Sequence, residues 1–169
     1  MKCFLFIVAI VFTHMAFAET TTVPVTDRPW VIIFDTPGQL QHESKSKGEY
    51  FQYTGHTSGG FNVSVFVEPI LGNGGSHKAV KAHYWPQMMK NPRIDPSSVM
   101  PMDQENHSSV KYIIEAEKDG VRHRIPNLNL FIEHEGAWID VHVSKYPWNK
   151  EDFLLFYDFQ NSLKFVKKK

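Results

Sequence analysis

Residues 50–67 read YFQYTGHTSGGFNVSVFV, and this stretch carries the clearest strand pattern in the chain. Large apolar residues alternate with smaller or polar ones over residues 50–54 and again over 61–67, as in strands with one buried face. The glycine-rich residues 55–60 between them are typical of a hairpin connection. The stretch therefore predicts a hairpin of two antiparallel strands.

Further strands are predicted on both sides of this hairpin. An apolar run at residues 30–34, ended by a Pro-Gly turn, predicts a strand on the N-terminal side. On the C-terminal side, residues 110–116, 124–134 and 138–143 predict a three-stranded meander with short turns. The remaining segments are polar or rich in proline and predict irregular structure: a loose leader at 19–28, a surface loop at 39–48 and irregular chain at 91–101.

Two segments show the helical period. Ser76 can cap a helix that runs to Met89 and is interrupted at Pro86. Asn149 can cap a last helix with an apolar stripe. The element order is then β-β-β-α-β-β-β-α. This order predicts a single α+β domain over residues 19–169, with a central antiparallel sheet flanked by two helices.

This order resembles that of the Mog1/PsbP-like family, small α+β domains with a central antiparallel sheet and flanking helices. The resemblance covers most of residues 30–166. It is carried by the strand at 30–34, the strand at 61–68 that leads into the helix, the meander at 128–144 and the closing segment 159–165. The family includes photosystem assembly proteins, a nuclear transport factor and exported proteins, so the resemblance implies a scaffold for binding more than a reaction.

The N-terminus has the parts of a secretory signal. Lys2 precedes an apolar run at residues 3–12, and Ala16 and Ala18 occupy the small-residue positions before a cleavage site. Cleavage after Ala18 would remove residues 1–18 and predicts a periplasmic or secreted protein. The apolar run is shorter than the roughly 20 residues of a membrane-spanning helix. No later segment is long and apolar enough, so we expect no transmembrane segment after cleavage.

The composition of the predicted mature chain excludes several classes of function. Removal of residues 1–18 removes Cys3, the single cysteine, and with it any disulfide, thiolate metal site or cysteine nucleophile. The remaining 17 basic and 18 acidic side chains nearly balance, which argues against a nucleic-acid partner. The Gly-x-Ser-x-Gly motif of serine hydrolases is missing, and no cofactor is predicted.

Histidine is the most unusual component of the predicted mature chain, which has eight. Asp140 and His142 are two residues apart, so both point to one face of a predicted strand, and His134 lies across a short turn. The three together would suit a divalent metal, and a His–Asp pair alone would suit a general base. These residues are candidates for a metal-dependent or histidine-based hydrolase. The alternative is a polar, solvent-facing side of a half-buried strand.

A second candidate metal site contains methionine. Met100 and Met102 are followed closely by His107. Thioether and imidazole ligands in an exported protein suit copper(I), so these three residues would serve a periplasmic copper carrier. The alternative is that the methionines fill irregular gaps in the core.

Aromatic residues near the ends of predicted elements form a third candidate site. Trp138, Tyr146 and Trp148 would make a binding patch if exposed, because aromatic side chains anchor interfaces, and would belong to the core if buried. The leading hypothesis is an exported, non-catalytic binding or accessory protein. Its expected partner is a protein or a small molecule.

Overall fold

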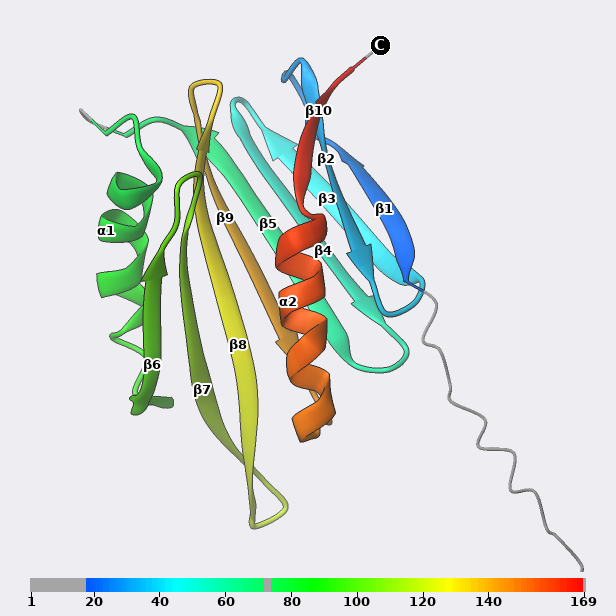
Figure 1. Ribbon diagram of the computed structural model, residues 1–169, viewed down its shortest axis with the longest axis vertical. Helices are drawn as coiled ribbons and strands as arrows, with labels where there is room; N and C mark the ends of the chain where they lie inside the picture. The colour runs from blue at the N-terminus through cyan, green and yellow to red at the C-terminus, as the bar shows by residue number, and fades with distance from the viewer. Residues whose placement is uncertain (1–17, 72–73, 169) are drawn as a thin grey trace, which may run out of the picture.

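The computed structural model describes residues 18–71 and 74–168, and there the chain forms two antiparallel sheets and two helices (Figure 1). The larger sheet has seven strands in the order β3-β4-β5-β9-β8-β7-β6, and the smaller has the order β1-β2-β10. The predicted secretory signal, residues 1–18, lies outside the described residues except for Ala18. No helix in these two described segments has both the length and the apolar character needed to cross a membrane.

The α+β class is confirmed, with more sheet than the sequence predicts. The strands of the larger sheet are β3 (Leu40–Lys47), β4 (Tyr50–Thr57), β5 (Phe61–Pro69), β6 (Ile94–Asp103), β7 (Ser108–Lys118), β8 (Val121–His134) and β9 (Ala137–Lys145). Those of the smaller sheet are β1 (Glu19–Pro24), β2 (Trp30–Thr36) and β10 (Lys164–Lys167). The helices are α1 (His77–Met88) and α2 (Phe153–Ser162), the latter preceded by a 3-10 turn at Lys150–Asp152.

The hairpin predicted from residues 50–67 is confirmed as β4 and β5. The two strands pair antiparallel, with Tyr53 opposite Val65. Gly60 in their connection has a φ of 79°, and a Cβ atom there would lie 1.8 Å from the carbonyl oxygen of Tyr146. Only glycine fits such a position, which explains the composition of the turn.

The structure has four strands that the predicted order β-β-β-α-β-β-β-α does not contain, so that order is incomplete. β1 lies in the predicted leader, β3 in the predicted surface loop and β10 directly after α2. β1 and β10 pair with β2, and β3 pairs with β4. Leu40 is the one buried residue of β3, because an edge strand pairs on one side and covers little apolar surface. Such strands lack the alternation on which strand prediction rests.

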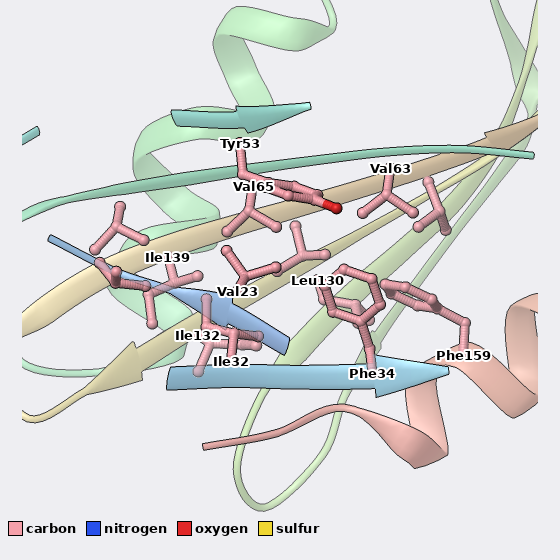
Figure 2. Packing of buried hydrophobic residues seen from close by; sticks show 14 of the residues in the cluster. Val23, Ile32, Phe34, Tyr53, Val63, Val65, Leu130, Ile132, Ile139 and Phe159 are labelled. Atoms are coloured by element: carbon pink, nitrogen blue, oxygen red, sulfur yellow. The ribbon is translucent and has the colours of Figure 1, made fainter. Parts of the chain in front are cut away.

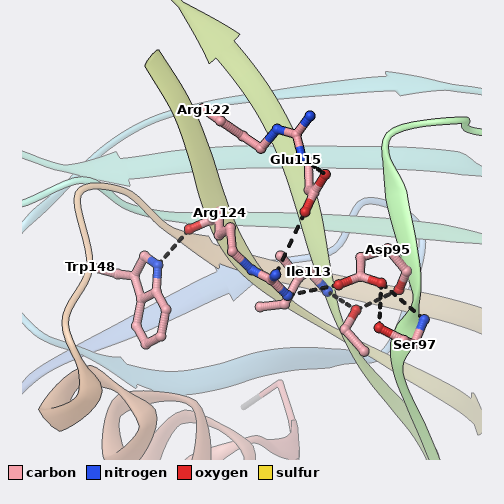
Figure 3. A network of polar contacts seen from close by, with 8 residues as sticks. Asp95, Ser97, Ile113, Glu115, Arg122, Arg124 and Trp148 are labelled. Carbon is pink, nitrogen blue, oxygen red and sulfur yellow. Dashed lines mark hydrogen bonds and ion pairs between the residues drawn. The ribbon is translucent and has the colours of Figure 1, made fainter.

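The fourth of these strands, β6, contains two prolines and is held to the sheet partly by side chains (Figure 3). Its register with β7 shifts after Asp95. In the interrupted stretch the backbone N–H of Ile113 donates to Ser98 Oγ at 2.8 Å. Asp95 accepts hydrogen bonds from Ser97 Oγ at 2.6 Å and from Arg124 Nη2 at 2.7 Å. The bond to Ser98 replaces part of the backbone ladder, and the Arg124 contact ties β6 to β8, so a segment rich in proline can form an edge strand.

One face of the seven-stranded sheet is closed by the smaller sheet and α2 (Figure 2). Val65 and Leu130 from the larger sheet belong to the same buried cluster as Ile32 and Phe34 from β2. α2 contributes Phe159, whose ring centroid lies 5.1 Å from that of Phe34. We call this side of the seven-stranded sheet the closed face, and it carries the main core.

The opposite side of the seven-stranded sheet is covered only in part. α1 packs against β7, β8 and β9. There Val80, Phe131 and Trp138 belong to a second, smaller buried cluster. Over β4 and β5 the same side carries residues that reach the surface, including Phe66, which is 43% exposed. We call this uncovered part, beside α1, the open face.

Candidate functional site

The open face has a polar depression around Asp140 and His142 of β9. Pairing between β5 and β9 sets Phe66 opposite Asp140 and Ser64 opposite His142, so the four side chains share one side of the sheet. Two adjoining cavities of about 350 Å³ and 510 Å³ meet here, and Ser64 and His142 line both. We call the combined depression the open-face groove.

Asp140 lies at the floor of the groove and is fixed by a neighbouring amide. Asn129 Nδ2 donates to Asp140 Oδ1 at 2.7 Å, and Asn129 Oδ1 in turn accepts from the Tyr112 hydroxyl at 2.9 Å. Burial raises the pKa of Asp140 to about 7, and the charge of Glu68 adds to the rise while the Asn129 hydrogen bond opposes it. The carboxyl group is therefore ionised only in part near neutral pH.

His142 is held in the same way by a second asparagine. Its Nε2 lies 2.8 Å from Asn127 Oδ1, and Asn127 Nδ2 donates to the carbonyl of Ile125 at 2.7 Å. Because the hydrogen bond to Ile125 fixes the orientation of the Asn127 side-chain amide, its Oδ1 faces the ring, and Nε2 of His142 is the protonated nitrogen. Burial lowers the pKa of His142 to about 4, so the ring is neutral at pH 7 and Nδ1 is a hydrogen-bond acceptor.

Phe66 supplies an apolar surface in this polar setting. Its strand, β5, is an interior strand with β4 on one side and β9 on the other. A large aromatic side chain that stays 43% exposed beside a groove is typical of a binding surface. The wall opposite the sheet comes from α1 and the chain after it, with Gln87, Met88 and Asn91 lining the smaller cavity.

Comparison with known proteins identifies the fold but no family. No family model matches the sequence, and a search of curated proteins finds no match. Among solved structures, LpqN of Mycobacterium tuberculosis, involved in cell envelope biogenesis, is similar with 14% identity, a TM-score of 0.53, and coverage of 88% of this chain and 91% of LpqN. A protein from Bacteroides thetaiotaomicron matches at 8% identity over 82% of this chain and 45% of its own, with a TM-score of 0.47. The likeness to LpqN shows an α+β fold alone.

The structure brings together two of the three residues predicted for a hydrolase. Asp140 and His142 share the groove, but His134 lies on the closed face, 4.2 Å from Phe165 and 5.2 Å from Trp30 between ring centroids. The reason is the register: the residue of β8 opposite Asp140 is Phe131, and His134, three residues further on, points to the other side. Within residues 18–71 and 74–168, no group of three or more His, Cys, Asp or Glu is arranged to hold a metal ion.

The three residues predicted to bind copper do not share a site. Met100 and Met102 on β6 are 58% and 53% exposed, so they do not fill the core either. His107 is half-buried, and its Nε2 lies 3.1 Å from Gln160 Nε2 of α2. It lines a separate cavity of about 550 Å³ together with His77 and His134, and neither methionine lines that cavity.

The predicted aromatic patch is divided between core and surface. Trp138 is 3% exposed and its Nε1 donates to the Gly74 carbonyl at 2.7 Å, so it cannot anchor a partner. It is buried because α1 covers this end of β9. Tyr146 is 39% exposed, and Trp148 packs edge-on against Phe153 at the start of α2. These two residues stay candidates for a surface contact.

Other residues of the groove are missed by the sequence reasoning, although the sequence carries signals for them. Asn127 and Asn129 are polar residues at period two in a strongly apolar strand, which indicates a buried polar row. Phe66 breaks the alternation of β5 by placing an aromatic residue where the pattern requires a polar one. Neither signal shows by itself that these residues lie together, because that depends on how β5 and β8 pair with β9.

Proposed function

We propose that the protein is an exported, non-catalytic binding or accessory protein that holds a small ligand in the open-face groove. The observation that carries the proposal is Phe66, a large aromatic side chain that is 43% exposed on an interior strand directly opposite Asp140. Small-molecule sites combine apolar or aromatic surface with a few fixed polar groups, and the groove has this composition.

The hydrogen bonds of the groove favour binding over catalysis. Asp140 and His142 each bond to a separate asparagine, Asn129 and Asn127. Neither bond joins the acid to the imidazole, so the pair is not arranged as a general base with its orienting partner. Side chains held by neighbours in this way are suited to presenting fixed acceptors to a ligand.

Export is part of the proposal. Cleavage after Ala18 would leave Glu19 as the first residue, and Glu19 begins β1, so no strand would be cut. LpqN, a protein of similar fold, is involved in cell envelope biogenesis, which agrees with a location in the periplasm or outside the cell. We further propose, on the resemblance of the strand groups at residues 30–34, 61–68 and 128–144, that the scaffold is Mog1/PsbP-like.

Equilibrium dialysis of residues 19–169 against a small-molecule extract of the expressing cells tests the proposal. Ser64→Trp fills the groove from its floor, since Ser64 lines both cavities. Tyr157→Trp, at an exposed position of α2, is the control. We expect at least one compound to be retained by the wild-type protein and by Tyr157→Trp but not by Ser64→Trp. If no compound distinguishes wild type from Ser64→Trp, the groove is not a binding site.

A histidine-based hydrolase is a second candidate, favoured by the presence of Asp140 and His142 in one cavity. A carboxyl group with a pKa of about 7 can donate a proton near neutral pH, and a neutral imidazole can accept one. The same dialysis separates the two functions. A binding protein returns the compound unchanged, whereas a hydrolase releases products, and Asp140→Asn abolishes their formation.

A further inference from the structure

We propose that the ligand of the open-face groove is a neutral saccharide, with one face of a sugar ring against Phe66 and its hydroxyl groups on Asp140, His142 and the neighbouring polar side chains. This inference rests on the proposed function and adds the chemical class of the ligand. It follows from the charge, the hydrogen-bonding groups, the apolar surface and the size of the groove.

The charges that line the groove favour a neutral ligand. Neither cavity is lined by a lysine or arginine, and the acidic residues lining them are Glu43 and Asp140. Glu43 already pairs with Lys45 at 3.3 Å. An anion would enter a half-buried site without a cationic partner, which is costly. A cation would meet Glu43, which is shared with Lys45, and Asp140, which is only partly ionised near pH 7 because burial raises its pKa.

The hydrogen-bonding groups match hydroxyls, which both donate and accept. Asp140 Oδ1 is occupied by Asn129 and His142 Nε2 by Asn127. Asp140 Oδ2 and His142 Nδ1 are then left for a ligand: Nδ1 accepts, and Oδ2 accepts when the carboxyl group is ionised and can donate when it is protonated. The two cavities are also lined by hydroxyl and amide side chains that supply mixed donors and acceptors, among them Thr54, Asn62, Ser64, Gln87 and Asn91.

The apolar surfaces of the groove match the faces of a sugar ring, which carry C–H groups while the hydroxyls lie at the edge. Phe66 on the sheet and Met88 on α1 line the same cavity. A peptide is less suited, because extended peptides gain affinity by pairing their backbone with a free sheet edge. β5 and β9, which carry Phe66, Asp140 and His142, are interior strands with a partner on each side, so around these residues the groove offers side chains alone.

The size of the groove is suited to a short oligosaccharide. Small-molecule sites typically occupy roughly 300–1,000 Å³. The cavity around Asp140 has a volume of about 350 Å³ and continues past Ser64 into the second, of about 510 Å³. The first can hold the sugar ring that contacts Phe66, and the second extends toward His56 for further rings.

NMR titration of ¹⁵N-labelled residues 19–169 tests the inference. The probes are neutral tetrasaccharides of glucose, mannose and N-acetylglucosamine, with choline and tetra-alanine as competing ligand classes. Each is added to about 10 mM, so that a Kd of about 1 mM is detected. We expect at least one tetrasaccharide to shift the amides around Phe66 and Asp140 saturably. Phe66→Ala should weaken that binding by roughly tenfold, as for loss of a stacked aromatic contact.

Two variants make the titration specific. Phe66→Leu keeps apolar bulk but lacks the flat ring, so it should weaken binding in a protein that folds normally. Phe153→Ala removes a phenylalanine of matched exposure, 45% against 43%, from α2 and should leave binding unchanged. If Phe66→Ala and Phe66→Leu bind the saccharide as tightly as wild type does, the sugar ring does not stack on Phe66.

The competing probes separate this inference from the proposed function. Groove shifts with choline or tetra-alanine, and with none of the saccharides, overturn the saccharide class while the binding function stands. Failure of every probe also overturns the saccharide class, and the dialysis comparison of wild type with Ser64→Trp then decides whether the groove binds anything.

Discussion

The two sides of β5 differ sharply in burial. Side chains at positions 61, 63, 65 and 67 are buried on the closed face, while those at 62, 64, 66 and 68 are exposed or half-buried on the open face. The closed face supplies apolar burial, the dominant favourable contribution to folding. The open face is therefore free to carry polar groups and an exposed aromatic ring that stability alone would not select.

The largest test of this comparison uses two phenylalanines on the same strand. Phe61 is fully buried, with ring centroids 6.1 Å from Phe156 and 5.9 Å from Phe159. Phe61→Ala should lower the free energy of unfolding by about 3–5 kcal/mol, because it leaves a cavity in the core. Phe66→Ala should lower it by less than about 1 kcal/mol. Urea denaturation measures both free energies. Similar losses of stability for the two variants would contradict the claim that the closed face, and not the open face, stabilises the fold.

The second test compares the covered and uncovered parts of the same side. Trp138→Phe keeps an aromatic ring under α1 but removes the Nε1 donor, leaving the Gly74 carbonyl without its partner at 2.7 Å. We expect a loss of about 1–3 kcal/mol in the free energy of unfolding. Tyr146→Phe, at a 39% exposed tyrosine, is the control and should change stability little. If Trp138→Phe leaves the free energy of unfolding unchanged, this hydrogen bond does not stabilise the packing of the chain around Gly74 on the sheet.

The same contrast explains what the sequence could predict. Residues 50–67 alternate because one side of each strand is buried, so the hairpin and its closed face follow from the period alone. The period does not predict β3 or β6. Leu40 is the one buried residue of β3, and in β6 the Ser98 side chain replaces part of the backbone ladder.

The candidate site was predictable only in part, for a related reason. Asp140 and His142 share a side because they are two apart on one strand, and this needs no knowledge of the partner strand. Whether His134 joins them depends on the register across the β8–β9 turn, and a shift of one residue reverses the answer. Phe66 and Asn129 come from other strands, so they meet Asp140 only through pairings that local patterns do not encode.

The third test concerns the two titrating groups of the groove, whose effects on stability have opposite signs. Asp140 has a pKa raised from 3.8 to about 7, so between these values the folded state holds a proton that the unfolded state has lost, and stability falls as pH rises. His142 has a pKa lowered from 6.5 to about 4, so between these values the unfolded state binds the extra proton, and stability rises with pH.

Single variants should expose these opposing slopes. Relative to wild type, Asp140→Asn should gain stability as pH rises from about 4 to 7, because the penalty for ionising the buried carboxyl is gone. His142→Gln should instead gain stability relative to wild type as pH falls from about 6.5 to 4. The full shifts correspond to about 4 kcal/mol for Asp140 and about 3 kcal/mol for His142. Both side chains are only half-buried, so water screens their charged forms and we expect about 1–2 kcal/mol across each window. Urea denaturation at several pH values gives the differences, and slopes of the same sign for both variants would refute the assignment.

The smallest effects should arise at the edge of the sheet, where exposed charges and a backbone donor can be compared directly. Arg124 reaches Asp95 and Glu115, but its side chain is 53% exposed, so water and salt screen these ion pairs. Arg124→Ala should therefore shift the urea midpoint only slightly, and the shift should vanish in high salt. Ser98→Ala leaves the Ile113 N–H without its acceptor and should cost about 1 kcal/mol regardless of salt. A larger, salt-dependent loss for Arg124→Ala would instead mean that charge, rather than the serine hydroxyl, holds β6 against β7.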